Sequence, residues 1–241
     1  MAADDFVDRY MSLDVGSITV ALNKYMIGAD FSSAKAKARQ AVQWTAKQKG
    51  LAPDANSFAR ANCGKVSPDD CEHILGLAID CGLVKQSDIQ AWADKNLGVD
   101  CTGFAVAYYD DIGLIDIDKY NGGASCFALL NGAVNNNRAS DGGPLIWSLD
   151  DVEVDDMILW MTNARTETRT PGHISIVYDI DEDLNKLYCA ESNGADDGNG
   201  HFGPKITERI WGGEQKGNGG RYVLLGKSDR VIIVRPPPSF G

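Results

Sequence analysis

The sequence pattern changes near the middle of the chain, and this change limits the folds that the chain can adopt. From about residue 33 to residue 113 the apolar residues recur at helical spacing, with helix-starting and helix-ending residues at the boundaries, such as Ser67-Pro68 and Gly82. From residue 157 onward, short apolar runs alternate with turn residues, which is typical of strands. Helices first and strands later predict an α+β fold rather than alternating βαβ units.

The individual elements follow from the same signals. We expect helices over about residues 33–49, 67–81, 87–96 and 101–112. We expect strands over 157–161, 174–180, 187–190, 206–211, 222–225 and 231–234. The first 30 residues show no clear period, and the stretch 121–143 is rich in Gly and Asn. A polar loop of that length beside a rigid core often shapes a functional site.

Charge and hydropathy narrow the classes of partner. The 241 residues include 34 Asp plus Glu and 23 Lys plus Arg, a net charge of −11. An acidic chain repels phosphate backbones and anionic lipid, so we predict no nucleic-acid partner. No stretch approaches the ~20 apolar residues of a membrane helix, so we predict no membrane span. Residues 1–6 lack the pattern of a signal peptide, so we expect synthesis in the cytoplasm and export by another route.

Neither the cysteines nor the acidic run 179–190 has the pattern of a metal site. The six cysteines, at 63, 71, 81, 101, 126 and 189, contain no CxxC pair and are too sparse for a disulfide scaffold. We read most of them as buried small apolar residues and leave their pairing open. The acidic run 179–190 lacks the glycine and glutamate of a calcium loop, since Leu184 and Ala190 occupy those positions. We therefore predict no metal and no cofactor.

One cysteine is placed as a nucleophile would be. Cys101 follows the break at Gly98 and begins a predicted helix, so its thiolate would face the positive end of the helix dipole. Gly103 keeps the first turn slim, which would let a substrate carbonyl approach the backbone N–H groups. A buried structural cysteine is the alternative interpretation of Cys101.

The sequence contains only three histidines that could act as the base for that nucleophile. His173 begins a predicted strand and Glu191 ends the next one, so a hairpin would bring them together. Glu191 would then orient the imidazole and stabilise its charged form. His201, in a Gly-rich loop, is either a substrate-binding group, a rival base or a solvated side chain. His73 lies two residues after Cys71 on one helix, where side chains do not face each other, so we discount that pair.

Four stretches of this sequence resemble one family. Residues 100–104 read DCTGF, and 156–160 read DMILW. Residues 172–177 read GHISIV, and 190–193 read AESN. In this order they resemble the DCSGF, GD-apolar, GHVAIV and E-x-N motifs of the NlpC-type and CHAP (cysteine, histidine-dependent amidohydrolase/peptidase) cell-wall hydrolases. The resemblance covers roughly residues 96–195.

The resemblance implies a papain-like fold, in which a nucleophile helix packs on an antiparallel sheet, and a thiol hydrolase of peptide or amide bonds. By carry-over, Cys101 is the nucleophile, His173 the general base and Glu191 the orienting residue. Asn193 supports them. The residues that we assign to the substrate side are Asp100, Gly103, Trp160 and His201.

Two positions depart from the family pattern. Thr102 stands where the family usually has Ser, which is a mild change. Asp155 stands where the family usually has Gly, which puts the turn before the strand at 157 in doubt.

Together these observations predict a helical N-terminal region, 1–95, packed on a cysteine hydrolase domain, 96–241, or one continuous domain. The expected activity is an amidase or endopeptidase on peptidoglycan stem peptides, acting in a target periplasm or cell wall. Since no wall-binding repeat is visible, we favour a delivered antibacterial toxin with an immunity protein or a delivery component as partner. The alternatives are a phage lysis protein, a cysteine protease or deamidase with a protein substrate, and a catalytically vestigial wall-binding or virion protein.

Overall fold

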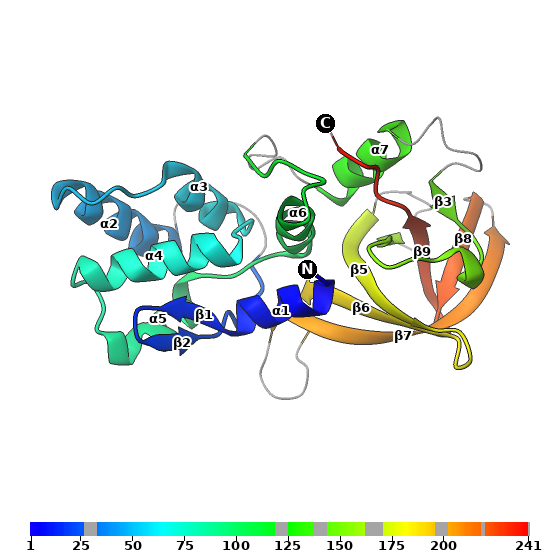
Figure 1. Ribbon diagram of the computed structural model, residues 1–241, viewed down its shortest axis with the longest axis horizontal. Helices are drawn as coiled ribbons and strands as arrows, with labels where there is room; N and C mark the ends of the chain where they lie inside the picture. The colour runs from blue at the N-terminus through cyan, green and yellow to red at the C-terminus, as the bar shows by residue number, and fades with distance from the viewer. Residues whose placement is uncertain are drawn as a thin grey trace.

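The computed structural model describes residues 1–26, 33–118, 125–136, 144–161, 171–195, 202–217 and 220–240. Figure 1 shows the helices of residues 34–96 gathered at one end of the molecule, a curved sheet at the other, and the helix that begins at Cys101 between them. The predicted α+β class is confirmed. No helix within the described ranges combines the length and the apolar character needed to span a bilayer.

The first half of the chain is mainly helical. Its elements are α1 (Ala3–Met11), β1 (Leu13–Val15), β2 (Ile18–Val20), α2 (Ala34–Gln48), α3 (Ala55–Cys63), α4 (Pro68–Asp80), α5 (Ile89–Asn96), α6 (Cys101–Asp111) and α7 (Cys126–Asn136). The start of α4 is the predicted one: the Ser67 hydroxyl and the Asp70 carboxylate accept each other's backbone N–H bonds, with Pro68 in the first turn. The short elements α1, β1, β2 and α3 have no clear signal in the sequence. Helix α7 lies within the stretch 121–143, so the expectation of a loop is wrong for residues 126–136.

The second half forms one antiparallel sheet. Its strands are β3 (Leu145–Ile146), β4 (Met157–Met161), β5 (Pro171–Asp181), β6 (Lys186–Asn193), β7 (Gly203–Gly217), β8 (Gly220–Leu225) and β9 (Asp229–Val234). Their order is β3-β9-β4-β5-β6-β7-β8. All six predicted strands are present.

The sheet closes on itself, because β8 also pairs with β9. The long strand β7 makes this possible: its first half pairs with β6 and its second half with β8. Between the halves the register shifts at Trp211–Gly213, where Gly213 has a φ of 91° that favours glycine. Strands β4 to β9 therefore enclose a small barrel.

Two apolar cores result from the alternation of side chains along the strands. On β4, Ile158 points into the barrel core, whereas Met157 and Leu159 join the core between the sheet and the helices. That second core also holds Phe6 of α1 and Phe104 of α6, whose rings meet edge-on at 5.6 Å. One core therefore contains residues from both predicted regions, and α1 packs directly on β5, β6 and β7.

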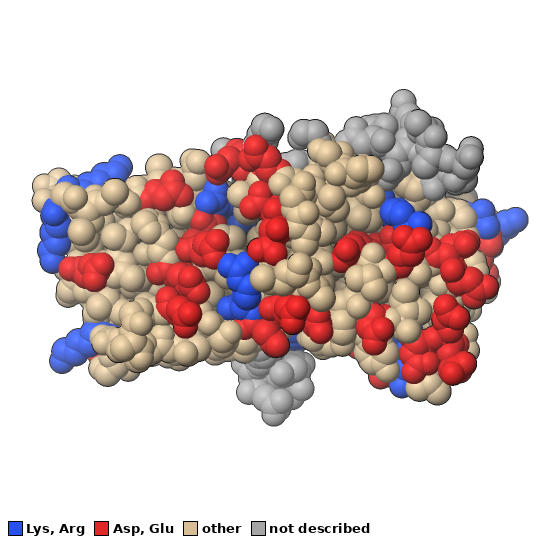
Figure 2. All heavy atoms as spheres, viewed as in Figure 1, with Lys and Arg blue, Asp and Glu red and all other residues tan. Residues whose placement is uncertain are grey.

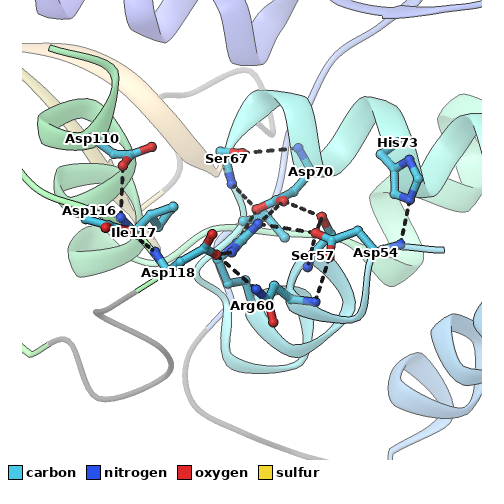
Figure 3. Close-up of polar contacts among 12 residues, drawn as sticks. Asp54, Ser57, Arg60, Ser67, Asp70, His73, Asp110, Asp116, Ile117 and Asp118 are labelled. Carbon is cyan, nitrogen blue, oxygen red and sulfur yellow. Dashed lines mark hydrogen bonds and ion pairs between the residues drawn. The ribbon is translucent and has the colours of Figure 1, made fainter. Parts of the chain in front are cut away.

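A buried ion pair ties α3 to α4 (Figure 3). Arg60 donates from Nε and Nη2 to the two oxygens of Asp70 at 2.7 and 2.6 Å, and both residues are buried. Ser57 donates to the same carboxylate at 2.6 Å, and Asp118, beyond α6, accepts from Arg60 at 2.8 Å. Burial alone would raise the pKa of Asp70, but these donors hold it below its usual value. The cluster therefore links α3 and α4 to the segment that follows α6.

The discounted pair in α4 has structural roles. The Nε2 of His73 accepts a hydrogen bond from the Asp54 backbone N–H at 3.0 Å (Figure 3). Cys71 is fully buried, and burial raises the pKa of its thiol well above the usual value. Neither residue has the setting of a nucleophile or a base.

Acidic side chains form several clusters on the visible surface. Figure 2 shows them over both the helical part and the barrel, with fewer basic side chains between them. This distribution agrees with the net charge of −11.

Candidate active site

Cys101 is the first residue of α6, and the chain before it is firmly held. The Asp100 carboxylate caps the helix by accepting from the Gly103 backbone N–H at 2.7 Å. Lys65 in turn donates to both Asp100 oxygens at 2.6 Å, and the Asp100 N–H donates to the Gly64 carbonyl at 2.8 Å. The Cys101 sulfur is thus fixed at the positive end of a helix, with only 5% of the residue exposed.

His173 and Glu191 lie side by side on β5 and β6, as the hairpin prediction required. The His173 Nε2 is 2.7 Å from Glu191 Oε2. Glu191 is completely buried, and its other oxygen accepts from Asn193 Nδ2 at 2.6 Å and from Arg209 Nη2 at 2.9 Å. Burial would raise the pKa of Glu191, but these three partners hold it below its usual value. Glu191 therefore stays ionised and fixes the imidazole.

Helix α6 packs on β5 and β6 and so carries Cys101 to His173. The two side chains are hydrogen-bonded. Since Nε2 is engaged with Glu191, Nδ1 is the ring nitrogen left for the sulfur. A hydrogen bond from Cys126, together with His173 and Tyr25, lowers the pKa of Cys101 to about 4, against the effect of burial. Burial opposes protonation of His173, but Cys101 and Glu191 raise its pKa to about 9. The pair is a thiolate and an imidazolium at neutral pH.

Two residues beside the sulfur were not predicted. The Tyr25 hydroxyl donates to Cys101 Sγ at 3.7 Å, and the thiol of Cys126 also bonds this sulfur. Burial and the neighbouring thiolate raise the pKa of Tyr25. The hydrogen bond to Cys101, followed by burial, raises the pKa of Cys126. Both groups therefore remain protonated donors. Tyr25 comes from a stretch without periodicity. Cys126 comes from the polar stretch 121–143 that we expected near a site.

A tryptophan and an arginine form the side of the site next to His173. Trp160 pairs with His173 across β4 and β5, and the ring centroids are 5.2 Å apart. The Arg209 guanidinium lies 5.2 Å from the centre of the indole ring and also bonds Glu191. Trp160 is therefore a neighbour of His173, and its contact with substrate stays a prediction. Arg209 was not predicted, because the sequence around it indicates a strand but no functional role.

Asp100 and Gly103 have roles that differ from the predicted contact with substrate. The Asp100 carboxylate is buried and already bound by Lys65, Thr102 and the helix N-terminus. A Cβ on Gly103 would lie 2.3 Å from the Gly64 carbonyl oxygen and 2.8 Å from Lys65 Cα. The space at Gly103 is therefore occupied by the protein's own backbone, and the expected approach of a substrate there is wrong. His201 lies outside the described residues.

The departure at Asp155 is accommodated by the backbone. Asp155 has a φ of 76°, in the region that glycine adopts most readily and that Asp tolerates better than most residues. Tyr108 bonds its carboxylate and Tyr109 donates to its carbonyl at 2.8 Å, so α6 holds the turn in place. The turn before β4 thus forms with Asp where the family usually has Gly.

Comparison of the chain with family models, with curated proteins and with solved structures found no match. A functional assignment therefore depends on the chemistry of the site. That chemistry resides in a buried thiolate, an imidazolium and a carboxylate that holds the imidazolium, which together suit nucleophilic attack on a carbonyl carbon.

Proposed function

We propose that this protein is a cysteine hydrolase that cleaves amide bonds, with peptidoglycan stem peptides as its substrate. The observation that carries the proposal is the connected set of Cys101, His173 and Glu191, in which the thiolate and the imidazolium stabilise each other. A structural cysteine needs neither a lowered pKa nor a fixed histidine beside it.

The proposed reaction uses these groups in four steps. The Cys101 thiolate attacks the carbonyl carbon, and the negative charge moves to the carbonyl oxygen. The Tyr25 hydroxyl lies 3.7 Å from the sulfur and also accepts from the Cys101 backbone N–H, so we assign it as the donor that turns to that oxygen. His173 then gives its proton to the leaving amine, which leaves an acyl-enzyme. Neutral His173 next takes a proton from water, the water attacks the acyl group, and the thiolate is released.

The choice of substrate rests on the resemblance to cell-wall hydrolases. The same site would serve a protease or a deamidase with a protein substrate, since both require acyl transfer to a thiol. A vestigial wall-binding protein fits less well, because nucleophile, base and orienting residue are all present and connected. Delivery as a toxin, an immunity partner and a phage origin stay predictions.

The test is digestion of purified peptidoglycan by the wild type and Cys101→Ala, with fragments identified by mass spectrometry. Cys63→Ala is the matched control, since Cys63 is a half-exposed cysteine at the end of α3. We expect stem-peptide fragments from the wild type and the control and none from Cys101→Ala, a loss of roughly 10³-fold or more. Retained activity in Cys101→Ala would refute the mechanism.

Two further outcomes separate the alternatives. An inactive wild type whose Cys101 is alkylated rapidly by iodoacetamide would point to a protein substrate. An inactive wild type with an inert Cys101 would favour the wall-binding alternative.

A further inference from the structure

A second thiol lies against the nucleophile, and the mechanism above does not require it. Cys101 and Cys126 are hydrogen-bonded through their sulfur atoms, and each residue is only 5% exposed. They begin two different helices, α6 and α7. A pair of cysteines that is separated by 24 residues in the sequence thus meets at the reacting sulfur.

The position of Cys126 is set by the way α7 packs. Ser125 caps this helix by accepting from the Ala128 N–H at 3.1 Å. Cys126, Leu129 and Ala133 are its buried residues, at the spacing of one helix face, and α7 packs on β5, the strand of His173. The thiol is therefore directed at the site by an apolar face.

The other four cysteines are placed differently. Cys71, Cys81 and Cys189 are buried, and burial raises the pKa of each thiol. Within the described ranges, no hydrogen bond joins Cys63 or any of these three to another cysteine. Oxidation is therefore expected to select Cys101 first, as the thiolate, and then its neighbour.

We propose that Cys101 and Cys126 form a reversible disulfide when a hydroperoxide oxidises the nucleophile, which switches the enzyme off and protects Cys101 from irreversible oxidation. The inference depends on the reactive thiolate of the proposed function and is independent of the substrate.

The chemistry proceeds in two balanced steps. The Cys101 thiolate attacks one oxygen of hydrogen peroxide: an S–O bond forms, the O–O bond breaks, and hydroxide leaves. Cys101 is then a sulfenic acid, oxidised by two electrons, and its negative charge is gone. The charge that opposed ionisation of Cys126 is thereby removed. The Cys126 sulfur attacks Cys101, an S–S bond forms, the S–O bond breaks, and the departing hydroxide takes the Cys126 proton as water.

The test uses the whole protein, treated with a mild excess of hydrogen peroxide and digested with trypsin without reduction. Trypsin cleaves after Lys119, so Cys101 and Cys126 fall on different peptides that only a disulfide can join. We expect this linked peptide in the wild type and in Cys63→Ser. We also expect loss of iodoacetamide labelling at Cys101, restored in full by dithiothreitol.

Cys126→Ser keeps a hydroxyl donor but cannot form the disulfide, and Cys126→Ala provides a second variant. In both, we expect peroxide to convert Cys101 to sulfinic or sulfonic acid, with labelling not restored by dithiothreitol. A wild type that yields these acids and no linked peptide would overturn the disulfide while leaving the hydrolase intact. An untreated Cys101 that does not react with iodoacetamide would overturn the thiolate, and both proposals with it.

Discussion

The Oε2 of Glu191 lies 2.7 Å from the Nε2 of His173, and Glu191 has no contact with solvent. A buried carboxylate is strongly destabilising unless it is paired and fully hydrogen-bonded. Here Asn193 and Arg209 bind the second oxygen, so every partner favours the charged form. The charge of Glu191 also acts on His173, because an ionised Glu191 keeps the imidazole protonated beside the nucleophile.

The first prediction concerns pH. The pKa of Cys101 is lowered to about 4, so the thiolate is present above that pH, and the pKa of His173 is raised to about 9, so the imidazolium is lost above that pH. We expect Cys101 in the folded protein to react with iodoacetamide at about pH 6, where an ordinary cysteine is almost wholly protonated. Hydrolysis should fall as the pH rises through about 9, because the leaving amine then lacks its proton donor.

The control for this measurement is the same protein unfolded in urea, in which alkylation should follow an ordinary thiol. A folded protein whose alkylation rises only near pH 8.5 or so would show that no thiolate–imidazolium pair exists.

The second prediction concerns Glu191→Gln. One of the two oxygens becomes an amide nitrogen, which cannot accept from His173, Asn193 or Arg209. We expect the pKa of His173 to fall toward its usual value and kcat/KM to drop by about 10²–10⁴-fold. The measurement is the pH profile of hydrolysis together with the NMR titration of His173. Glu208→Gln is the matched control, since Glu208 pairs with Lys186 on β7, away from His173. Equal effects of the two substitutions would remove Glu191 from the site.

The third prediction concerns Tyr25→Phe. The change keeps the ring and removes the hydroxyl that donates to Cys101 Sγ at 3.7 Å. We expect the pKa of Cys101 to rise, measured by the ultraviolet absorbance of the thiolate. We also expect kcat to fall by about 10²–10³-fold, because the proposed mechanism uses this hydroxyl as a donor to the oxyanion. Tyr222→Phe, on β8, is the control. An unchanged thiolate titration would show that Tyr25 only fills space.

The strands and the hairpin pair were predictable because both depend on local patterns. A β-branched run bounded by turn residues defines β5 and β6, and the antiparallel hairpin then places the start of one strand near the end of the next. His173 and Glu191 were found in this way. Cys101 was found from its position at a helix start, which the cap at Asp100 explains.

The missed residues depend on long-range packing. Tyr25 lies in an extended segment held by Asn23 and Lys24 backbone contacts to residues 99 and 202, which no local pattern reveals. Arg209 meets Glu191 only because β7 runs beside β6 at one register. The lack of a side chain at Gly103 predicts a close approach, but no local pattern indicates that the approaching group is the protein's own backbone at Gly64.

The last prediction uses that close approach. In Gly103→Ala, the new methyl would lie 2.3 Å from the Gly64 carbonyl oxygen and 2.8 Å from Lys65 Cα, and backbone atoms cannot rotate away. We expect α6 to shift, with a loss of about 1–3 kcal/mol or more in the free energy of unfolding, because overpacking forces the backbone apart. Gly76→Ala in α4 is the matched control: no atom lies within 4 Å of its new methyl, so a gain of about 0.5–1 kcal/mol is expected. Urea denaturation measures both.

Since Gly103 lies two residues after the nucleophile, the shift should also slow alkylation of Cys101, whereas Gly76→Ala should not. Equal stability of the two variants would contradict the packing of α6 against Gly64 and Lys65.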